Sequence, residues 1–316
     1  MYQAKHGLKR GLGTILPVFL RCTCSNRRGC LWILSYHDIG EVTQFKNGVP
    51  KIGAYDFEKH LRIFGKYFKL RPLSRAIHDL ETGCLQGANV TITFDDGDSS
   101  FKEVVLPLLK KYDVPATVFV CGSTAANDKP LWGDGLRALW TTARMHELAD
   151  ILDTEPGALN SFAQVSRQCQ IHYSDALRDK LVAAARAARN GGRRYLSAKD
   201  LEAMPPGLVE IGSHTWSHAP LAAIADAELD VEIGRNHDYL RQFPAFAPTF
   251  AIPFGQPRHF RAEQVQHIRK FFGLRVCSSS GGVNRRATDF DYSRIGGDVL
   301  PDEMKGHLLN QALVRR

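Results

Sequence analysis

The stretch Asn89-Val90-Thr91-Ile92-Thr93-Phe94-Asp95-Asp96-Gly97 decides how the rest of the chain is interpreted. Its first six residues are rich in β-branched and aromatic side chains, which predicts a strand. The spacing of apolar residues over 101–112 predicts a helix soon after it. Reactive side chains sit at the carboxyl ends of parallel strands, so we expect Asp95 and Asp96 to lie at that edge of a sheet.

Short apolar runs alternate with helical patterns along most of the chain. We expect further strands over residues 31–36, 115–120, 208–211, 249–252, 274–278 and 293–295, and helices over 57–68, 73–80, 198–204, 226–243 and 261–272. The alternation stops over residues 130–194, where helical patterns occur over 136–152 and 174–189 without a strand. This order predicts an α/β fold, with a parallel sheet covered by helices and a helical insertion at about 130–194.

The composition is that of an ordinary folded protein. The chain has 316 residues, of which 44% are hydrophobic and 23% charged. These values exclude a disordered chain, a collagen-like fibre and a disulfide-dense miniprotein. The length fits two domains or a single α/β barrel. We expect a basic N-terminal arm over residues 1–30 and one folded domain over 31–316.

The charge is moderately basic. Lys and Arg number 41 and Asp and Glu 33, which gives a net charge of +8, and much of the surplus lies in the N-terminal arm. Such a surplus favours polyanions or anionic membrane surfaces. Basic and aromatic residues are not interleaved as in nucleic-acid-binding segments, so we expect no nucleic-acid partner. Peripheral membrane contact through the arm stays open.

The cysteines and the N-terminal apolar run bear on the cellular compartment. Seven scattered cysteines lack the paired spacing of a disulfide framework or a four-cysteine zinc site, which favours thiols in a reducing compartment. Residues 12–20 resemble the apolar region of a signal peptide, but Arg21 interrupts them and no small-residue cleavage site follows. No stretch reaches the ~20 apolar residues of a membrane-spanning helix. We expect a cytoplasmic, membrane-associated or free protein, with an exported form left open.

Two histidines and two aspartates could form a metal site. His214 and His218 are four residues apart, so on one helical turn both rings would face one ion. A catalytic Zn2+ takes three protein ligands and keeps a position open for water. Asp95 and Asp96 could supply the third ligand and a proton acceptor. The alternatives are a helix start at the histidines and an Asp-Asp-Gly97 turn that caps the next helix; together the motifs favour the metal site.

Three segments carry a family resemblance. Thr93-Phe94-Asp95-Asp96-Gly97, His214-Thr215-Trp216-Ser217-His218 and Phe250-Ala251-Ile252-Pro253-Phe254-Gly255 resemble, in order, motifs of the polysaccharide deacetylases, carbohydrate esterase family 4. The resemblance runs over about 31–300. It implies a distorted, incomplete (β/α) barrel, a divalent metal with Zn2+ the expected ion, and an N-acetylated glycan as substrate.

The resemblance also implies roles for individual residues. It assigns Asp95 as the catalytic base and Asp96, His214 and His218 as the metal ligands. Candidate substrate or oxyanion contacts of weaker standing are Gly97, Trp216, Pro253 and Phe254. A backbone N–H near Gly97 or Ser123 is expected to hold the tetrahedral oxyanion.

The general acid and the partner of the base are less clear from the motifs. Leu34-Ser35-Tyr36-His37-Asp38-Ile39-Gly40 is similar to the opening strand of a subgroup that deacetylates surface and biofilm polysaccharides, so His37 is favoured as the acid over His307. The alternative for His37 is a core histidine. Ala251 stands where the family commonly has an Arg that orients the base, and Arg294 or Arg258 could replace it.

These roles favour one reaction over its rivals. An amine leaves a tetrahedral intermediate only when it is protonated, so a general acid such as His37 points to N-deacetylation of amino sugars. The rivals are an O-acetyl esterase or a cyclic amide hydrolase on the same fold, and a glycan-binding relic without activity.

The helical insertion could overhang the site. Trp132 and Trp140 could stack on sugar rings, or could equally be core residues of amphipathic helices. A basic helix around Arg178, Lys180 and Arg186 would suit an anionic or diphosphate-linked glycan.

Overall fold

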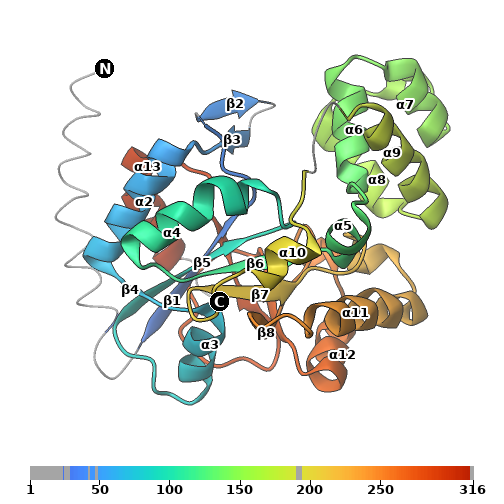
Figure 1. The fold of residues 1–316 in the computed structure, drawn as a ribbon. Coiled ribbons are helices and arrows are strands. Elements are labelled where there is room, and N and C mark those ends of the chain that lie inside the picture. The colour runs from blue at the N-terminus through green and yellow to red at the C-terminus, as the bar shows by residue number, and fades with distance from the viewer. Residues whose placement is uncertain (1–23, 25–28, 42, 47–48, 190–193, 314–316) are drawn as a thin grey trace.

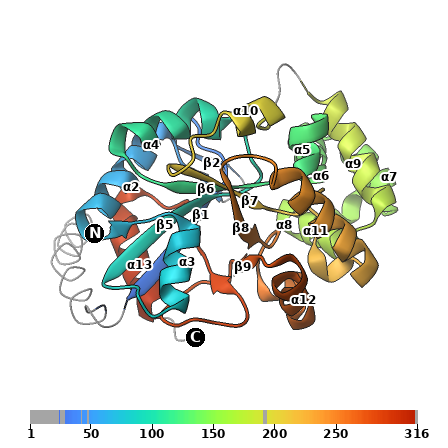
Figure 2. The ribbon, with the colours of Figure 1, turned by 60° about the horizontal axis from the view of Figure 1, so that its bottom comes forward.

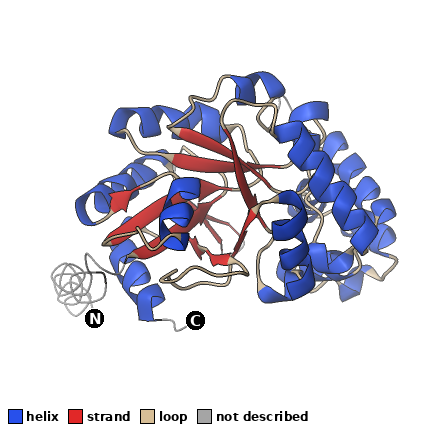
Figure 3. Ribbon diagram, turned by 90° about the horizontal axis from the view of Figure 1, so that it is seen from below, coloured by secondary structure: helices blue, strands red, loops and turns tan. Residues whose placement is uncertain are grey.

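A computed structural model describes residues 24, 29–41, 43–46, 49–189 and 194–313. Its centre is a sheet of parallel strands, several of which are labelled in Figure 1. The strand order is β10-β9-β8-β7-β6-β5-β1-β11, with β4 paired to β5. Helices surround the strands, which lie at the centre of the molecule in Figure 3. The chain therefore forms a distorted, incompletely closed (β/α) barrel, as expected. The strands are β1 Cys30–Tyr36, β4 Lys69–Leu70, β5 Ala88–Phe94, β6 Ala116–Val120, β7 Val209–Ser213, β8 Phe246–Ala251, β9 Arg275–Ser278, β10 Tyr292–Ser293 and β11 Ile295–Gly296.

The central strands are apolar because both of their faces are covered. All seven residues of β1 are buried, as are six of the seven residues of β5. Strands buried on two faces have continuous apolar runs rather than an alternating pattern. A separate antiparallel pair, β2 Gln44–Lys46 and β3 Val49–Lys51, precedes the first long helix.

A single residue joins the two ends of the sheet. β10 pairs with β9 at one end and β11 pairs with β1 at the other, yet only Arg294 separates β10 from β11 in the chain. The Arg294 N–H donates to the carbonyl oxygen of Ser278 at 2.8 Å. The barrel is thus closed by covalent continuity at Arg294 rather than by a ladder of hydrogen bonds.

The helices follow the strands on the outside of the barrel (Figure 2). The helix expected over 101–112 begins as a π-helical turn, Phe101–Val105, and continues as α4 from Leu106, with Pro107 in its first turn. The helices outside the insertion are α2 Ala54–Tyr67, α3 Leu73–Glu81, α4 Leu106–Tyr112, α5 Gly122–Asn127, α10 Ala198–Glu202, α11 Asp226–Leu240, α12 Ala262–Phe272 and α13 Pro301–Leu313.

The insertion forms a helical lobe, which we define as α6 Trp132–Thr141, α7 Met145–Leu152, α8 Phe162–Ile171 and α9 Asp175–Ala187. Figure 1 shows it as a green body beside the barrel. Gly135 lets α6 lie against α9, because a Cβ there would come within 1.8 Å of the Leu181 carbonyl oxygen. Apolar side chains of the lobe, including Leu136, share one cluster with Phe250 of β8, so the lobe packs on the barrel.

The structure corrects some boundaries and adds elements. The stretch expected to be helical over 136–152 is two helices, because Ala143 turns the chain with a φ of 55°. The sequence patterns missed β2, β3, β4, α5, α8 and α13. The basic arm over 1–30 lies almost entirely outside the described residues. Every helix within the described ranges is too short or too polar to cross a membrane, and no disulfide links the described cysteines.

Candidate active site

Three potential metal ligands converge at one edge of the sheet. Asp96 follows β5, and His214 and His218 follow β7, two strands away. Asp96 Oδ1 lies 3.6 Å from His214 Nε2 and 3.3 Å from His218 Nε2. One ligand atom from each of the three residues lies within 4.8 Å of the other two. The expectation that side chains after parallel strands meet at one edge of the sheet therefore located this cluster correctly.

The histidine pair reaches this geometry without a helix. We expected both rings on one helical turn, but His214 to Pro220 form an irregular loop. Thr215 and His218 take left-handed φ values of 62° and 60°. These two reversals fold the loop back on itself, and the ring centroids lie 5.0 Å apart. The four-residue spacing correctly predicted that the two rings lie close together, but the prediction that a helical turn brings them there was wrong.

Both imidazoles are held in a form that can bind a cation. His214 Nδ1 lies 2.7 Å from the Ala251 carbonyl oxygen, which only accepts, so Nδ1 carries the proton and Nε2 is left as the acceptor. Burial lowers the pKa of His218 to about 4, although Asp96 opposes the shift. Asp96 Oδ1 is buried and has no hydrogen-bond partner. The Nε2 atoms of the two imidazoles, together with the orphaned carboxylate oxygen of Asp96, fit a divalent ion.

Asp95 lies beside the cluster in a buried ion pair. Arg294 Nη1 donates to Asp95 Oδ1 at 2.6 Å and Nη2 donates to Oδ2 at 2.9 Å. Burial alone would raise the pKa of Asp95, but Arg294 and then His214 hold it well below its usual range. The carboxylate is therefore ionised. Of the two arginines expected to replace the motif Arg, Arg294 contacts Asp95, and Arg258 lines a separate pocket.

His37 reaches the same edge from β1. Its side chain is 57% exposed, and Nδ1 lies 3.8 Å from Asp298 Oδ2. Burial of its surroundings acts to lower the pKa of His37, but Asp298, Asp95 and Asp96 outweigh it and raise that pKa. His307, the other candidate acid, lies on α13 with Nε2 2.9 Å from the Gly296 carbonyl oxygen. The geometry thus favours His37, an accessible and charged group near both aspartates.

Comparison with known proteins now decides the family. The sequence profile described as polysaccharide deacetylase matches residues 82–276, more than half of the chain. The chain belongs to the polysaccharide deacetylase family.

Solved structures resemble this deacetylase in fold. The deacetylase PplD of Streptococcus pyogenes, in complex with acetate, is 17% identical with a TM-score of 0.61, over 90% of this chain and 98% of that one. IcaB from Ammonifex degensii is 19% identical with a TM-score of 0.53, over 90% and 97%. BC0361, a polysaccharide deacetylase from Bacillus cereus, is 14% identical with a TM-score of 0.56, over 88% and 69%. No curated protein sequence matches the chain significantly.

The backbone amides expected to form the oxyanion hole are already used. The Gly97 N–H donates to the Asp95 carbonyl oxygen at 2.9 Å, and the Ser123 N–H donates to the Trp216 carbonyl oxygen at 3.0 Å. These expectations are therefore wrong. The N–H of Phe254, the third-motif residue, makes no hydrogen bond with the described part of the chain. Its left-handed φ of 61° and its ring contact with His218, 4.8 Å between centroids, place it beside the cluster.

The aromatic and basic residues of the deacetylase's insertion have structural roles. Trp132 is 2% exposed and donates from Nε1 to the His218 carbonyl oxygen at 3.1 Å, so it supports the metal loop and cannot stack on a sugar. Trp140 packs edge-on against Phe162 within the lobe. Arg178, one of the three basic residues expected on α9, pairs with two aspartates of its own helix, Asp175 and Asp179.

The contacts of Trp216 and Pro253 differ from the substrate contacts that we expected for them. The Trp216 ring lies under the Arg235 guanidinium at 3.9 Å and packs edge-on against Tyr239, both on α11. It is thus engaged with α11 rather than placed for a substrate. Pro253 is buried in the third-motif loop and shapes the turn, since its carbonyl oxygen accepts the Gly255 N–H at 2.7 Å.

The sequence analysis missed the residues that hold the loop over 214–220, which carries both histidines of the cluster. Glu232 on α11 is 9% exposed and accepts from Ser217 N at 2.9 Å and Ser217 Oγ at 2.7 Å. Tyr173 Oη lies 3.2 Å from the same hydroxyl. A glutamate that is buried on an otherwise amphipathic helix has no motif of its own, so only the structure identifies it. Asp298, beside His37, was missed for the same reason.

Proposed function

We propose that this deacetylase is a metal-dependent hydrolase that removes acetyl groups from the N-acetylated amino sugars of a bacterial-type surface polysaccharide or its precursor. The observation that carries the proposal is the cluster of Asp96, His214 and His218 beside an ionised Asp95. Family membership supports hydrolytic deacetylation. The site supplies the groups that hydrolysis of an acetamide requires.

The cation would be held by Asp96 and by the Nε2 atoms of His214 and His218, and Zn2+ suits two imidazoles and one carboxylate. Bound there, a divalent ion supplies an acidified water, with a pKa toward ~7, and polarises the acetyl carbonyl. Three protein ligands are the number that leaves a coordination position free for water in catalytic zinc sites. Ala251 contributes through its carbonyl oxygen, which fixes the tautomer of His214.

Asp95 would accept the proton of the attacking water. Its low pKa makes it a weak base, so the role suits a water that is itself acidified. Arg294 keeps the carboxylate ionised and aims it. The Phe254 N–H would donate to the oxyanion that develops on the acetyl group.

His37 would donate a proton to the departing nitrogen. The carboxylates around it favour its charged form, and its exposed ring can reach a bound substrate. An amine leaves poorly without this proton, whereas an activated ester does not need it. This group is our reason for favouring N-acetyl over O-acetyl substrates.

Acetate release tests the proposal. The purified chain is incubated with a panel of N-acetylhexosamine oligosaccharides, with and without a chelator, beside the Asp95→Asn variant. We expect acetate and an equal amount of free amine from the wild type, and loss of both with chelator or with Asp95→Asn. Ester cleavage or ring opening in the product analysis would identify a rival hydrolase, and glycan binding without acetate would identify a relic.

A further inference from the structure

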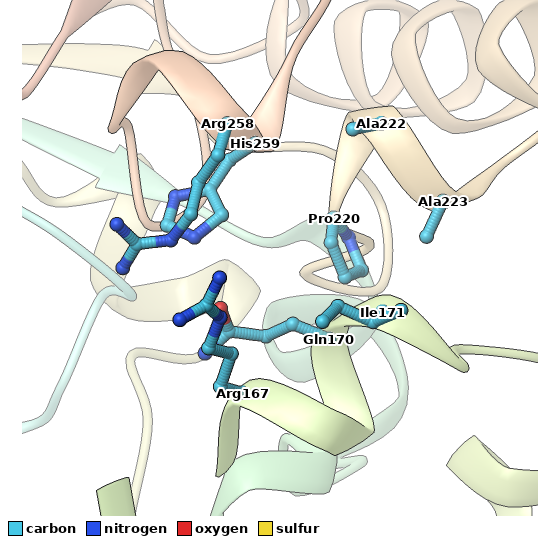
Figure 4. A pocket seen from close by; sticks show the side chains of 8 residues that line it. All are labelled: Arg167, Gln170, Ile171, Pro220, Ala222, Ala223, Arg258 and His259. Atoms are coloured by element: carbon cyan, nitrogen blue, oxygen red, sulfur yellow. The ribbon is translucent and has the colours of Figure 1, made fainter. Parts of the chain in front are cut away.

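A pocket of about 260 Å³ lies next to the metal cluster and is not part of it. It is bounded by α8 of the helical lobe, by the loop after His218 and by the short helix η4 Pro257–His259 (Figure 4). Its lining residues are Arg167, Gln170, Ile171, Pro220, Ala222, Ala223, Arg258 and His259. None of the candidate metal ligands lines it. The helical lobe thus builds a cavity that the barrel alone does not have.

One aromatic ring separates the pocket from the cluster. The Phe254 ring contacts His218 at 4.8 Å and His259 at 5.3 Å between centroids. Pro220 in the pocket wall follows His218 by two residues. If the acetylated residue of a glycan lies at the cluster, its neighbouring residue would pass the Phe254 ring to reach the pocket.

The pocket has a cationic end and an apolar end. In Figure 4 the guanidinium groups of Arg167 and Arg258 gather near the His259 ring, and Pro220 and Ile171 lie toward the other side. Arg167 and Arg258 come from two different elements, α8 and η4. Within the described ranges, neither arginine has an ion pair or a hydrogen bond. Both arginines are exposed, and two guanidinium groups that line one pocket without an acidic partner favour binding of an anion.

His259 adds an unmet donor to the wall. Its side chain is 6% exposed, and Nδ1 accepts the Gln256 N–H at 3.1 Å. Burial, with help from Arg258, lowers the pKa of His259 to about 4, so the ring is neutral and its proton sits on Nε2. Nε2 is buried without a hydrogen-bond partner. A ligand oxygen reaches it only if the wall adjusts, whereas the guanidinium groups of Arg167 and Arg258 are exposed.

We propose that this pocket binds an anionic group, a carboxylate or a phosphate, on the sugar next to the acetylated one. The substrate is then an acidic glycan, and the pocket selects it over a neutral one. Arginine suits both anions because its planar fork donates two parallel hydrogen bonds. The apolar end suits the C–H face of a sugar ring. This proposal rests on the proposed function for the placement of the acetylated residue.

Binding of three probes to the full chain tests the pocket by calorimetry. Tetra-N-acetylchitotetraose is neutral, a hyaluronan tetrasaccharide carries carboxylates on the sugars next to its N-acetylated ones, and a 6-O-phosphorylated tetra-N-acetylchitotetraose carries phosphates on neighbouring sugars. We expect at least one acidic probe to bind more tightly than the neutral one and to weaken as salt is raised. Arg167→Gln and Arg258→Gln should each weaken that probe by about tenfold. The probe that responds identifies the anion.

Arg241→Gln is the matched control, because Arg241 is an exposed arginine that does not line the pocket and pairs with Asp238. It should leave the preference for the acidic probe intact. Equal binding of neutral and acidic probes, or equal effects of all three variants, would overturn the proposal. Acetate release is measured separately on the same probes. Arginine-dependent binding without acetate release would support the anion pocket and contradict the proposed function. Acetate release without any preference for acidic probes would support the proposed function and contradict the anion pocket.

Discussion

Arg294 holds both carboxylate oxygens of Asp95, at 2.6 and 2.9 Å, although 199 residues separate the two in the chain. Both side chains are almost fully buried, at 1% and 7% exposed. Arg294 is also the residue that joins β10 to β11. The same residue that closes the barrel therefore fixes the proposed catalytic base, which couples completion of the fold to assembly of the site.

Removal of the Arg294 charge should damage both stability and activity. Arg294→Gln leaves Asp95 buried without its partner, and breaking a buried ion pair from one side costs about 3–5 kcal/mol. Because the base also loses its orientation, we expect acetate release to fall by at least about 100-fold. Urea unfolding and acetate assays on the same preparation measure the two effects.

The double variant Asp95→Asn/Arg294→Gln separates the two effects. With both charges gone, no buried ion is left unpaired, so stability should recover part of the loss seen with Arg294→Gln while activity stays absent. Losses that simply add would mean that the two residues do not interact in solution.

The sequence was sufficient for the parts of the site that follow a strand. Asp96, His214 and His218 could be placed together because the carboxyl ends of parallel strands share one edge. The partner of Asp95 could not be chosen between Arg294 and Arg258, since no local pattern records which distant residue closes the barrel. The loop shape at Thr215 and His218 was also unpredictable, because left-handed φ values there have no glycine to mark them.

The sequence also could not predict which polar and aromatic residues would be buried. Trp132 could have been a sugar platform or a core residue, and only its packing against His218 and Phe254 decides for the core. The Gly97 and Ser123 amides were plausible oxyanion donors until the turns that use them were visible. Helix and strand patterns specify which elements form, and these details depend on how the elements meet.

The proposed acid role of His37 predicts an unequal loss on two substrates. His37→Gln removes the proton donor but keeps a polar side chain of similar size. We expect hydrolysis of an N-acetyl sugar to fall by about 100-fold or more, and hydrolysis of an activated aryl acetate to change little. Steady-state acetate release on both substrates is the measurement. His307→Gln serves as the control and should affect neither, and equal losses with His37→Gln would contradict the role.

Glu232 should act on metal affinity through the loop. Glu232→Ala removes both acceptors of Ser217, the residue directly before His218, so we expect metal to bind about 10–100-fold more weakly. Glu232→Gln can still accept the Ser217 N–H and donate to its hydroxyl, so it should retain most of the affinity. Competition with a chromophoric chelator measures the affinity in each variant. An equal loss in both variants would show that the charge, and not the hydrogen bonds, matters.

His60 should make the folded protein less stable in mild acid. It is fully buried, its Nδ1 lies 3.0 Å from Tyr36 Oη, and burial lowers its pKa from 6.5 to about 4. Between pH 6.5 and 4 the unfolded chain therefore binds a proton that the folded chain does not. The free energy of unfolding must then fall as the pH falls through this window, by up to about 3 kcal/mol from this group.

His60→Gln should flatten that dependence, since glutamine does not titrate and can still accept from Tyr36. Urea unfolding at pH 7, 5.5 and 4.5 gives the slope for the wild type and for the variant. His146→Gln, at an exposed position in the helical lobe, is the control and should follow the wild type. His218 titrates in the same direction in the metal-free protein, so the comparison is made with chelator present throughout. Parallel curves for the wild type and His60→Gln would show that His60 is not buried as a neutral ring.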